Sequence, residues 1–151
     1  MDQASKEFAL DIINKGKDLT LATVRPDGYP QATTVSYAND DLTIYVGVGK
    51  ESQKIHNIRE NNKVSLTINT DYHNWSEIKG LSIGGIAEIL TDSDEIRRAT
   101  GCMIKRFPQV IEWLDSGQAS EAVFLKITPQ IISILDYEKG FGHTNLVEVQ
   151  G

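Results

Sequence analysis

The segment LTLATVRPDGYPQATTVSYANDDLTIYVGV, residues 19–48, decides the fold that we expect. Leu19–Arg25 alternates apolar and polar side chains as a half-buried strand does. Pro26-Asp27-Gly28 is typical turn sequence and leads into a second strand at Pro30–Tyr37. A further turn of Asn and Asp residues precedes a third strand at Leu42–Val48, whose alternate residues share one face. We therefore expect three consecutive antiparallel strands, each paired with the next.

Helices and strands alternate along the rest of the chain. Ser5 is placed to cap a first helix, and the patterns predict further helices at 52–61, 92–107 and 108–114. Strands are expected at 63–69, at 81–90 with a bulge at Gly84-Gly85, at 123–128 and 131–136 as a pair around Pro129, and at 146–149. Closing such a sheet on itself removes its edges. The prediction is a mostly β protein with flanking helices, an antiparallel barrel of six or seven strands in a single domain spanning 1–151.

Composition narrows the classes of function. The net charge is −6, from 21 acidic and 15 basic side chains. An acidic surface disfavours nucleic acid and anionic membranes as partners, and no apolar run reaches the length of a membrane span. Residues 1–17 lack the apolar stretch of a signal peptide, so we expect a cytoplasmic protein. The single cysteine, Cys102, and three scattered histidines predict neither a disulfide nor a metal site.

A candidate anion site lies where the third strand leads into the helix at 52–61. The residues concerned are Gly47, Val48 and Gly49 at the end of the strand and Ser52, Gln53 and Lys54 at the start of the helix. Amides at a helix N-terminus attract anions, a serine hydroxyl donates to phosphate, and a lysine supplies charge. Glycines let a flat ligand approach the backbone. An ordinary helix cap with solvated lysines explains the same spacing, so both interpretations stay open.

The strand at 30–37 offers a second candidate surface. Alternation places Ala32, Thr34 and Ser36 on one face and Thr33, Val35 and Tyr37 on the other. Small, mildly polar side chains leave room for a planar ring and provide hydroxyls for its edge, although an ordinary exposed strand face looks the same. If this strand pairs with the strand at 42–48, a ring beside it and a phosphate at the helix start lie within the length of one mononucleotide.

Several segments share their order and spacing with a known family. They are Leu19-Thr-Leu-Ala-Thr, Pro26-Asp-Gly-Tyr-Pro-Gln-Ala, Ser52-Gln-Lys, Asn61-Asn-Lys-Val-Ser-Leu and Ile83-Gly-Gly-Ile-Ala-Glu. Over about residues 5–140 the chain resembles the pyridoxamine 5′-phosphate oxidase-like family of split barrels that bind flavin mononucleotide (FMN). The resemblance implies a split antiparallel barrel and a homodimer with FMN at the subunit interface.

The same resemblance assigns cofactor-binding residues. Ala32, Thr33, Thr34, Val35 and Ser36 would run along the flavin ring, Gly47, Val48 and Gly49 along the ribityl side, and Ser52, Gln53 and Lys54 would hold the phosphate. Three departures follow. Gln53 stands where the family often has arginine, which predicts looser FMN binding. Gly80 stands where the true oxidases have a glutamine. Their Trp- and Arg-containing C-terminal segment has no counterpart, so oxidation of pyridoxamine phosphate is not expected.

The function that we expect is an FMN-dependent oxidoreductase acting on a small molecule, with the flavin at a homodimer interface. The substrate and the electron donor are not specified by the sequence. Trp75, Trp113, Phe141 and His143 either reach the partner's flavin or serve ordinary packing, and no side chain is nominated as catalytic. Two alternatives stay open: a non-enzymatic flavin-binding or sensor protein, and a split barrel that binds haem or a deazaflavin.

Overall fold

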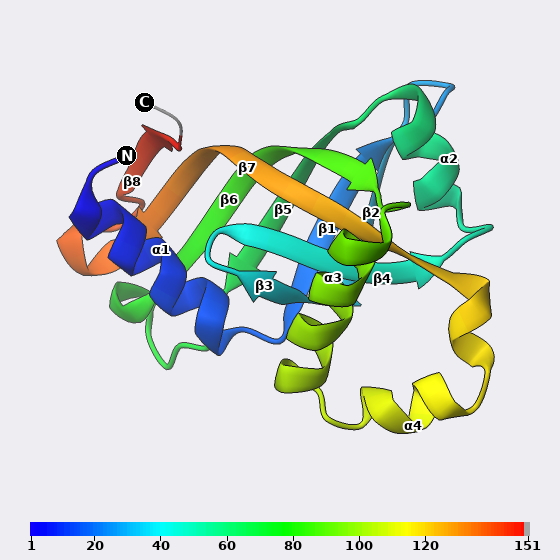
Figure 1. Ribbon diagram of the computed structural model, residues 1–151. Helices are drawn as coiled ribbons and strands as arrows, with labels where there is room; N and C mark the ends of the chain where they lie inside the picture. Colours follow the sequence, from blue (N-terminus) through cyan, green and yellow to red (C-terminus); the bar gives the residue numbers. More distant parts are fainter. Residues whose placement is uncertain (150–151) are drawn as a thin grey trace.

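In the computed structural model, which describes residues 1–149, eight strands form one antiparallel sheet that curls into a split barrel with helices outside it (Figure 1). The strands are β1 (Asp18–Val24), β2 (Pro30–Ser36), β3 (Ala38–Asp40), β4 (Thr43–Gly49), β5 (Lys63–Asn69), β6 (Lys79–Ile89), β7 (Ala122–Asp136) and β8 (Thr144–Glu148). The helices are α1 (Gln3–Lys15), α2 (Gln53–Glu60), α3 (Ser93–Arg106) and α4 (Val110–Asp115), with short 3-10 turns η1 (Trp75–Glu77), η2 (Gln118–Glu121) and η3 (Tyr137–Lys139). The predicted fold class is confirmed, and the last two residues of the expected domain lie outside the described part.

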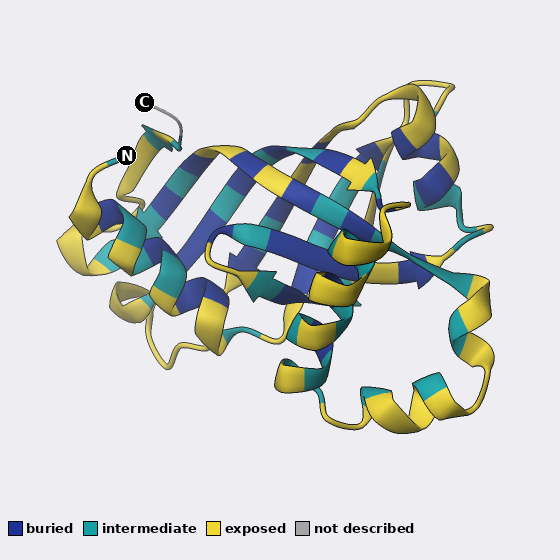
Figure 2. Cartoon of the chain, viewed as in Figure 1, coloured by how far each residue is buried: buried dark blue, intermediate teal, exposed yellow. Residues whose placement is uncertain are grey.

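The core lies inside the curl of the sheet, as the alternation of the strands predicts. The strand order is β2-β1-β5-β6-β7-β4-β3, and β8 pairs with β7. Leu21, Leu66, Ile83 and Leu125 are among the fully buried side chains that these strands point inward. Figure 2 shows the resulting alternation of buried and exposed residues along the strands. Burial of this apolar surface supplies most of the driving force for the fold.

The expected pairing of the strand at 30–37 with the strand at 42–48 is wrong. β2 pairs with β1, whereas β4 pairs with β7 and with the short β3. The chain changes partners at Tyr37, which is fully buried and donates its hydroxyl to the Ile13 carbonyl oxygen at 2.6 Å. This anchor ends β2 and lets the next three residues pair with β4. Barrel closure therefore brings β2 toward β4 without a hydrogen-bonded ladder between them.

The bulge predicted at Gly84-Gly85 is confirmed, but the predicted strand break at Pro129 is wrong. Gly84 faces Ile131 and Gly85 faces Pro129, so β7 carries one extra residue at this point and continues without a turn. A Cβ on Gly85 would lie 2.7 Å from the Thr128 carbonyl oxygen, so glycine is required for the two strands to approach. Proline is tolerated here because a bulge removes the need for its missing N–H.

The helix boundaries follow the predicted caps with one exception. α2 begins after Ser52, and α3 begins after Asp92, whose side chain accepts a hydrogen bond from the Glu95 amide at 3.0 Å. Ser5 does not cap α1: the Asp2 carboxylate accepts from the Ser5 amide at 2.7 Å, so the helix begins three residues earlier than expected. Among the residues described, no helix has the length and apolarity needed to cross a membrane.

Candidate cofactor site

The start of α2 presents a group of unused hydrogen-bond donors. The Ser52 side chain does not cap the helix, and its Oγ is shielded from solvent with no hydrogen-bond partner. The Ser52 amide donates to the Gly49 carbonyl at 3.0 Å, whereas the Gln53 and Lys54 amides have no acceptor among residues 1–149. The first turn contains no acidic side chain. A buried donor without a partner costs about 1–3 kcal/mol, so this arrangement favours an anion.

Lys54 is the available cation beside these donors. Its side chain is half-buried and makes no ion pair with any described residue. The neighbouring Lys50 is already committed, since its Nζ lies 3.8 Å from a Glu121 carboxylate oxygen. Arg59 lies in the last turn of α2, away from the start of the helix. The charge for an anion at this helix start therefore comes from Lys54.

Gln53 is directed toward the interior of the protein. Its Nε2 donates to Asn57 Oδ1 at 2.8 Å, and Asn57 Nδ2 donates in turn to Thr23 Oγ1 at 2.9 Å and to Gln31 Oε1 at 3.0 Å. Asn57 and Thr23 are both buried. One N–H of the Gln53 side chain is thus occupied by Asn57, and the backbone amide of Gln53 is available to a ligand.

The side-chain amide of Asn57 joins α2 to β1 and β2, a connection that the sequence patterns do not predict. The strand pairing predicted to hold the helix start and the strand at 30–37 together is not formed. Instead, one buried side chain bridges them. The signal in the sequence was a polar residue between Ile55 and Ile58 on the inner side of the helix, where a polar group must be hydrogen-bonded.

The hydroxyls of β2 divide between its two faces. Ala32, Thr34 and Ser36 are exposed, but Thr34 Oγ1 shares a hydrogen bond with Thr20 at 3.3 Å and Ser36 Oγ donates to Asp18 at 3.2 Å. Thr33 lies on the opposite, half-buried face, and its Oγ1 has no hydrogen-bond partner among the described residues. The uncommitted hydroxyl of this strand therefore lies on the inner face, and the hydroxyls of Thr34 and Ser36, on the face predicted to lie along a ring, are engaged.

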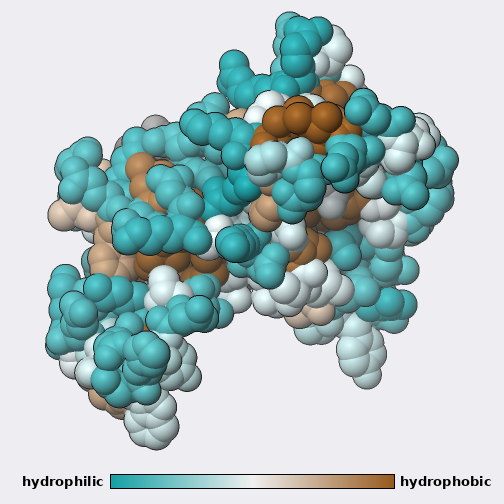
Figure 3. All heavy atoms as spheres, turned by 90° about the horizontal axis from the view of Figure 1, so that it is seen from below, coloured by the Kyte–Doolittle hydropathy of each residue, from teal (hydrophilic) through white to brown (hydrophobic). Residues whose placement is uncertain are grey.

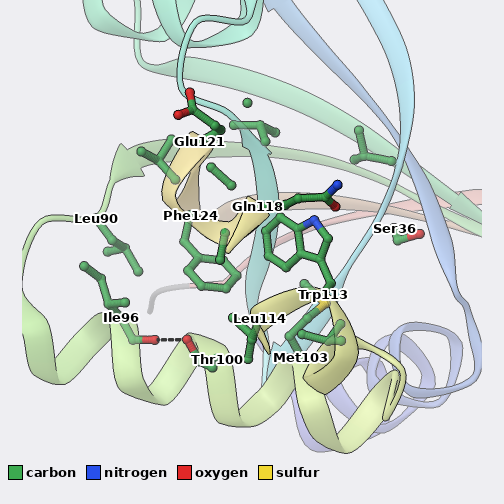
Figure 4. Close-up of a pocket in the computed structure, with 18 residues that line it drawn as sticks. Ser36, Leu90, Ile96, Thr100, Met103, Trp113, Leu114, Gln118, Glu121 and Phe124 are labelled. Atoms are coloured by element: carbon green, nitrogen blue, oxygen red, sulfur yellow. Dashed lines mark hydrogen bonds between the residues drawn. The ribbon is translucent and has the colours of Figure 1, made fainter. Parts of the chain in front are cut away.

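A pocket of about 690 Å³ opens between the end of β4, the start of β7 and the helical segment from α3 to η2 (Figure 4). Val35 and Ser36 line it together with Gly47, Val48 and Gly49. The pocket thus joins two groups of the predicted residues. Ala32, Thr33, Thr34, Ser52, Gln53 and Lys54 do not line it.

Seen from below, the molecular surface is largely polar, with apolar side chains showing in recesses between polar ones (Figure 3).

The glycines at the end of β4 leave space beside the backbone. A Cβ on Gly49 would meet nothing within 4 Å, and one on Gly47 would lie 3.8 Å from the Phe124 ring. Neither glycine is required by packing, which is the pattern expected if a ligand needs that space. Gly80 is different, because a Cβ there would lie 2.9 Å from Asn69 Oδ1. Gly80 therefore cannot make the side-chain contact expected of the glutamine at this position in the true oxidases.

The aromatic residues considered from the sequence fall into two groups. Trp113 lines the pocket. Trp75 and Phe141 pack against each other with ring centroids 5.6 Å apart, and Phe141 also contacts Tyr137 at 5.4 Å. Trp75 lies in η1 and Phe141 shortly after η3, and both side chains are exposed. His143, two residues further on, is exposed as well. Only Trp113 is thus brought to the predicted glycines.

Comparison with known proteins agrees with this architecture. Residues 5–136 match the family model described as pyridoxamine 5′-phosphate oxidase. General stress protein 26 of Bacillus subtilis (strain 168) is 25% identical over 134 residues, which cover 89% of this chain and 90% of that protein.

Solved structures share the fold over the whole chain. A conserved hypothetical protein from Mycobacterium tuberculosis has a TM-score of 0.78 at 26% identity, covering 100% of this chain and 95% of its own. A haem-binding protein from Mycobacterium smegmatis has a TM-score of 0.82 at 18% identity; the match covers 98% of this chain and 59% of that protein, and it shows the fold alone. Because the family model spans most of the sequence, the chain belongs to the pyridoxamine 5′-phosphate oxidase family.

Proposed function

We propose that this protein is an FMN-dependent oxidoreductase that acts on a small molecule. The observation that carries the proposal is the start of α2. Among residues 1–149, the buried Ser52 hydroxyl and the Gln53 and Lys54 amides have no hydrogen-bond partner, and the Lys54 side chain beside them has no ion-pair partner. Phosphate is the anion that such a group of donors suits best. Bound FMN would supply the hydride chemistry, and the protein would position it.

The donors of α2 would hold the phosphate in a defined way. The Ser52 hydroxyl and the two backbone amides donate to phosphate oxygens, and Lys54 neutralises part of the charge. Hydrogen bonds to a charged group are worth about 1.5–3 kcal/mol each. Because Gln53 is uncharged and its amide donates to Asn57, this position lacks the forked cation that arginine would provide. We therefore expect weaker FMN binding than in relatives with arginine at this position.

The remainder of the cofactor would extend from the helix start past Gly49 toward the pocket. The short connection from Gly49 to Ser52 is closed by the hydrogen bond between the Ser52 amide and the Gly49 carbonyl. Gly47 and Gly49 leave room for the ribityl chain, and Val35, Ser36 and the unpartnered Thr33 hydroxyl lie on the neighbouring β2. A homodimer that completes the flavin site is part of this proposal.

Haem is the second candidate, because the Mycobacterium smegmatis protein of the same fold is named for binding it. The pocket supports this less well. Of the described residues that line it, none is His, Cys or Tyr, and Met103 is the one side chain of a type that commonly ligates haem iron. His56, His73 and His143 are all exposed. FMN needs no metal ligand, so this shortage of axial ligands among the described residues counts against haem alone.

Fluorescence titration of the purified protein with FMN tests the proposal. Lys54→Glu should weaken FMN binding at least about a hundredfold, since it replaces attraction by repulsion at the phosphate. Lys63→Glu, at the exposed start of β5 and beyond the opposite end of α2, makes the same charge change away from the helix start and should leave the affinity within about twofold. Equal affinities of Lys54→Glu and the unaltered protein would refute the phosphate assignment.

A second measurement separates an oxidoreductase from a flavin-binding sensor. The FMN-loaded protein should oxidise a reduced nicotinamide in the presence of an electron acceptor faster than the same concentration of free FMN does. A rate equal to that of free FMN would support the non-enzymatic alternative instead.

A further inference from the structure

We infer that the pocket beneath α3, α4 and η2 binds a neutral, mostly apolar molecule of about the size of an aromatic ring system. The inference rests on the proposed function only where it calls this molecule the substrate of the flavin. The site itself follows from the size, lining and charge of the pocket.

The size and lining of the pocket are those of a small-molecule site. Its volume of about 690 Å³ falls within the range of about 300–1,000 Å³ that is usual for ligand pockets. Its walls are formed largely by apolar side chains, among them Leu90, Ile96, Met103, Trp113, Leu114 and Phe124 (Figure 4). An apolar ligand that displaces water from such side chains gains binding free energy, because apolar surface on both sides is removed from water.

The charges around the pocket decide which ligands it accepts. None of the described residues that line it is Lys or Arg, and the one charged residue, Glu121, is 3.8 Å from Lys50. In Figure 4 the Glu121 carboxylate points away from the apolar side chains. An anion in this pocket would lose its hydration without gaining a cation, which is costly. The lining therefore selects against phosphorylated substrates such as pyridoxamine phosphate.

Two polar side-chain groups in the pocket, the Gln118 amide and the Trp113 indole N–H, remain available for orientation. Thr100 Oγ1 donates to the Ile96 carbonyl at 2.8 Å, and the Ser36 hydroxyl donates to Asp18. The Gln118 side chain makes no hydrogen bond with the described residues. It can offer either a donor or an acceptor. The ligand is therefore expected to carry one uncharged hydrogen-bonding group, such as a carbonyl.

The outer wall of the pocket is separate from the core of the barrel. The buried core clusters contain no residue of α4 or η2. Substitutions in α4 should therefore change ligand binding without unfolding the sheet. Leu114 lines the pocket, whereas Ile111 on the same helix is 48% exposed and does not line it. These two residues provide a matched pair for a test.

The experiment compares two fluorescent probes with one skeleton, neutral N-phenyl-1-naphthylamine and its anionic relative 8-anilinonaphthalene-1-sulfonate. Each is titrated into the full chain with and without saturating FMN. The neutral probe should bind with a stoichiometry of one per chain and at least about tenfold more tightly than the sulfonate. Leu114→Asp should weaken neutral-probe binding at least about tenfold, and Ile111→Asp should leave it unchanged. Trp113→Phe should abolish energy transfer to the probe, and Trp75→Phe should not.

Several results would overturn the inference. The apolar site is refuted if the neutral probe does not bind, if it binds no more tightly than the sulfonate, or if Leu114→Asp and Ile111→Asp weaken its binding equally. Release of the probe as the protein concentration rises would also refute it, because it would show that a second copy of the chain covers the pocket. Probe binding by a protein that takes no FMN would confirm the apolar site but refute its assignment to a flavin substrate. FMN binding without probe binding would refute the pocket and leave the flavin proposal intact.

Discussion

The side-chain amide of Asn57 should contribute more to stability than any other polar group of α2, and it should also support cofactor affinity. It is buried and takes part in three hydrogen bonds, with Gln53, Thr23 and Gln31. Replacement by alanine removes all of them and leaves the buried Thr23 hydroxyl without this partner. The helical backbone accommodates the substitution, because alanine is the best helix former.

The magnitude follows from those contacts. Each lost hydrogen bond costs about 1 kcal/mol net, and an unsatisfied buried hydroxyl about 1–3 kcal/mol. The higher helix propensity of alanine returns about 0.6 kcal/mol. Asn57→Ala should therefore lower the free energy of unfolding by about 3–5 kcal/mol. With a urea m-value of about 2 kcal/mol/M, the midpoint falls by about 1.5–2.5 M.

The assay is urea unfolding followed by tryptophan fluorescence, with FMN titration of the folded protein in parallel. His56→Ala changes the adjacent exposed residue of the same helix and should alter the free energy of unfolding by less than about 0.5 kcal/mol. In the absence of urea, we also expect Asn57→Ala to weaken FMN binding about tenfold, because α2 loses its hydrogen bond to Gln31 of β2. If both variants have the same small effect on unfolding, the bridging role of Asn57 is refuted.

Three further predictions concern single sites. Burial, opposed by the charge of Arg106, raises the pKa of Tyr37 to about 12, whereas an unfolded tyrosine titrates near pH 10. The contribution of the neutral phenol to the free energy of unfolding, on the order of 2 kcal/mol after allowance for solvent screening, is therefore complete below pH 10 and is lost as the pH rises toward 12. Alkaline unfolding curves of Tyr37→Phe should show a shallower loss of stability over this range. Gly101→Ala, on the exposed side of α3 where a Cβ meets nothing within 4 Å, should raise the free energy of unfolding by about 0.5–1 kcal/mol in urea denaturation, and a decrease would contradict the reasoning. Gly49→Ala should leave the melting temperature nearly unchanged but weaken FMN binding about tenfold in titration, and full affinity would show that the cofactor does not use this space.

Local signals in the sequence predicted most of the elements. The cap at Asp92, the start of α2 after Ser52 and the bulge at Gly84-Gly85 were all found correctly. Each depends on a few neighbouring residues whose conformational preferences are strong. Because such preferences act within one turn or one strand, they can be recognised without knowledge of the tertiary structure.

Long-range features were predicted less well. The pairing of β4 with β7 joins segments far apart in the chain, and alternation within each strand gives no information about its partner. Alternation predicted Tyr37 to be one more strand residue, although the hydrogen bond from its buried hydroxyl to the Ile13 carbonyl marks the end of β2. Pro129 predicted a break between two strands because proline usually interrupts a strand, and the sequence does not show that Gly85 lies opposite it in a bulge.

The candidate site shows the same division. Glycines before a capped helix indicated an anion site from local spacing alone, and the unpartnered Ser52 hydroxyl agrees with that interpretation. The inward turn of Gln53 and the bridge through Asn57 depend on contacts with β1 and β2. The apolar pocket depends on how α3 and α4 pack beside β4, which no motif specifies.

The central claim is that this chain binds FMN, and competition between FMN and haem tests it most directly. The purified protein, stripped of any bound ligand, is titrated with each compound and then with one in the presence of the other, while absorbance spectra are recorded. We predict saturable FMN binding at one molecule per chain, seen as a structured flavin band, with no Soret band that persists when FMN is present in equal concentration. A stable Soret band together with an unperturbed spectrum of free FMN would contradict the claim.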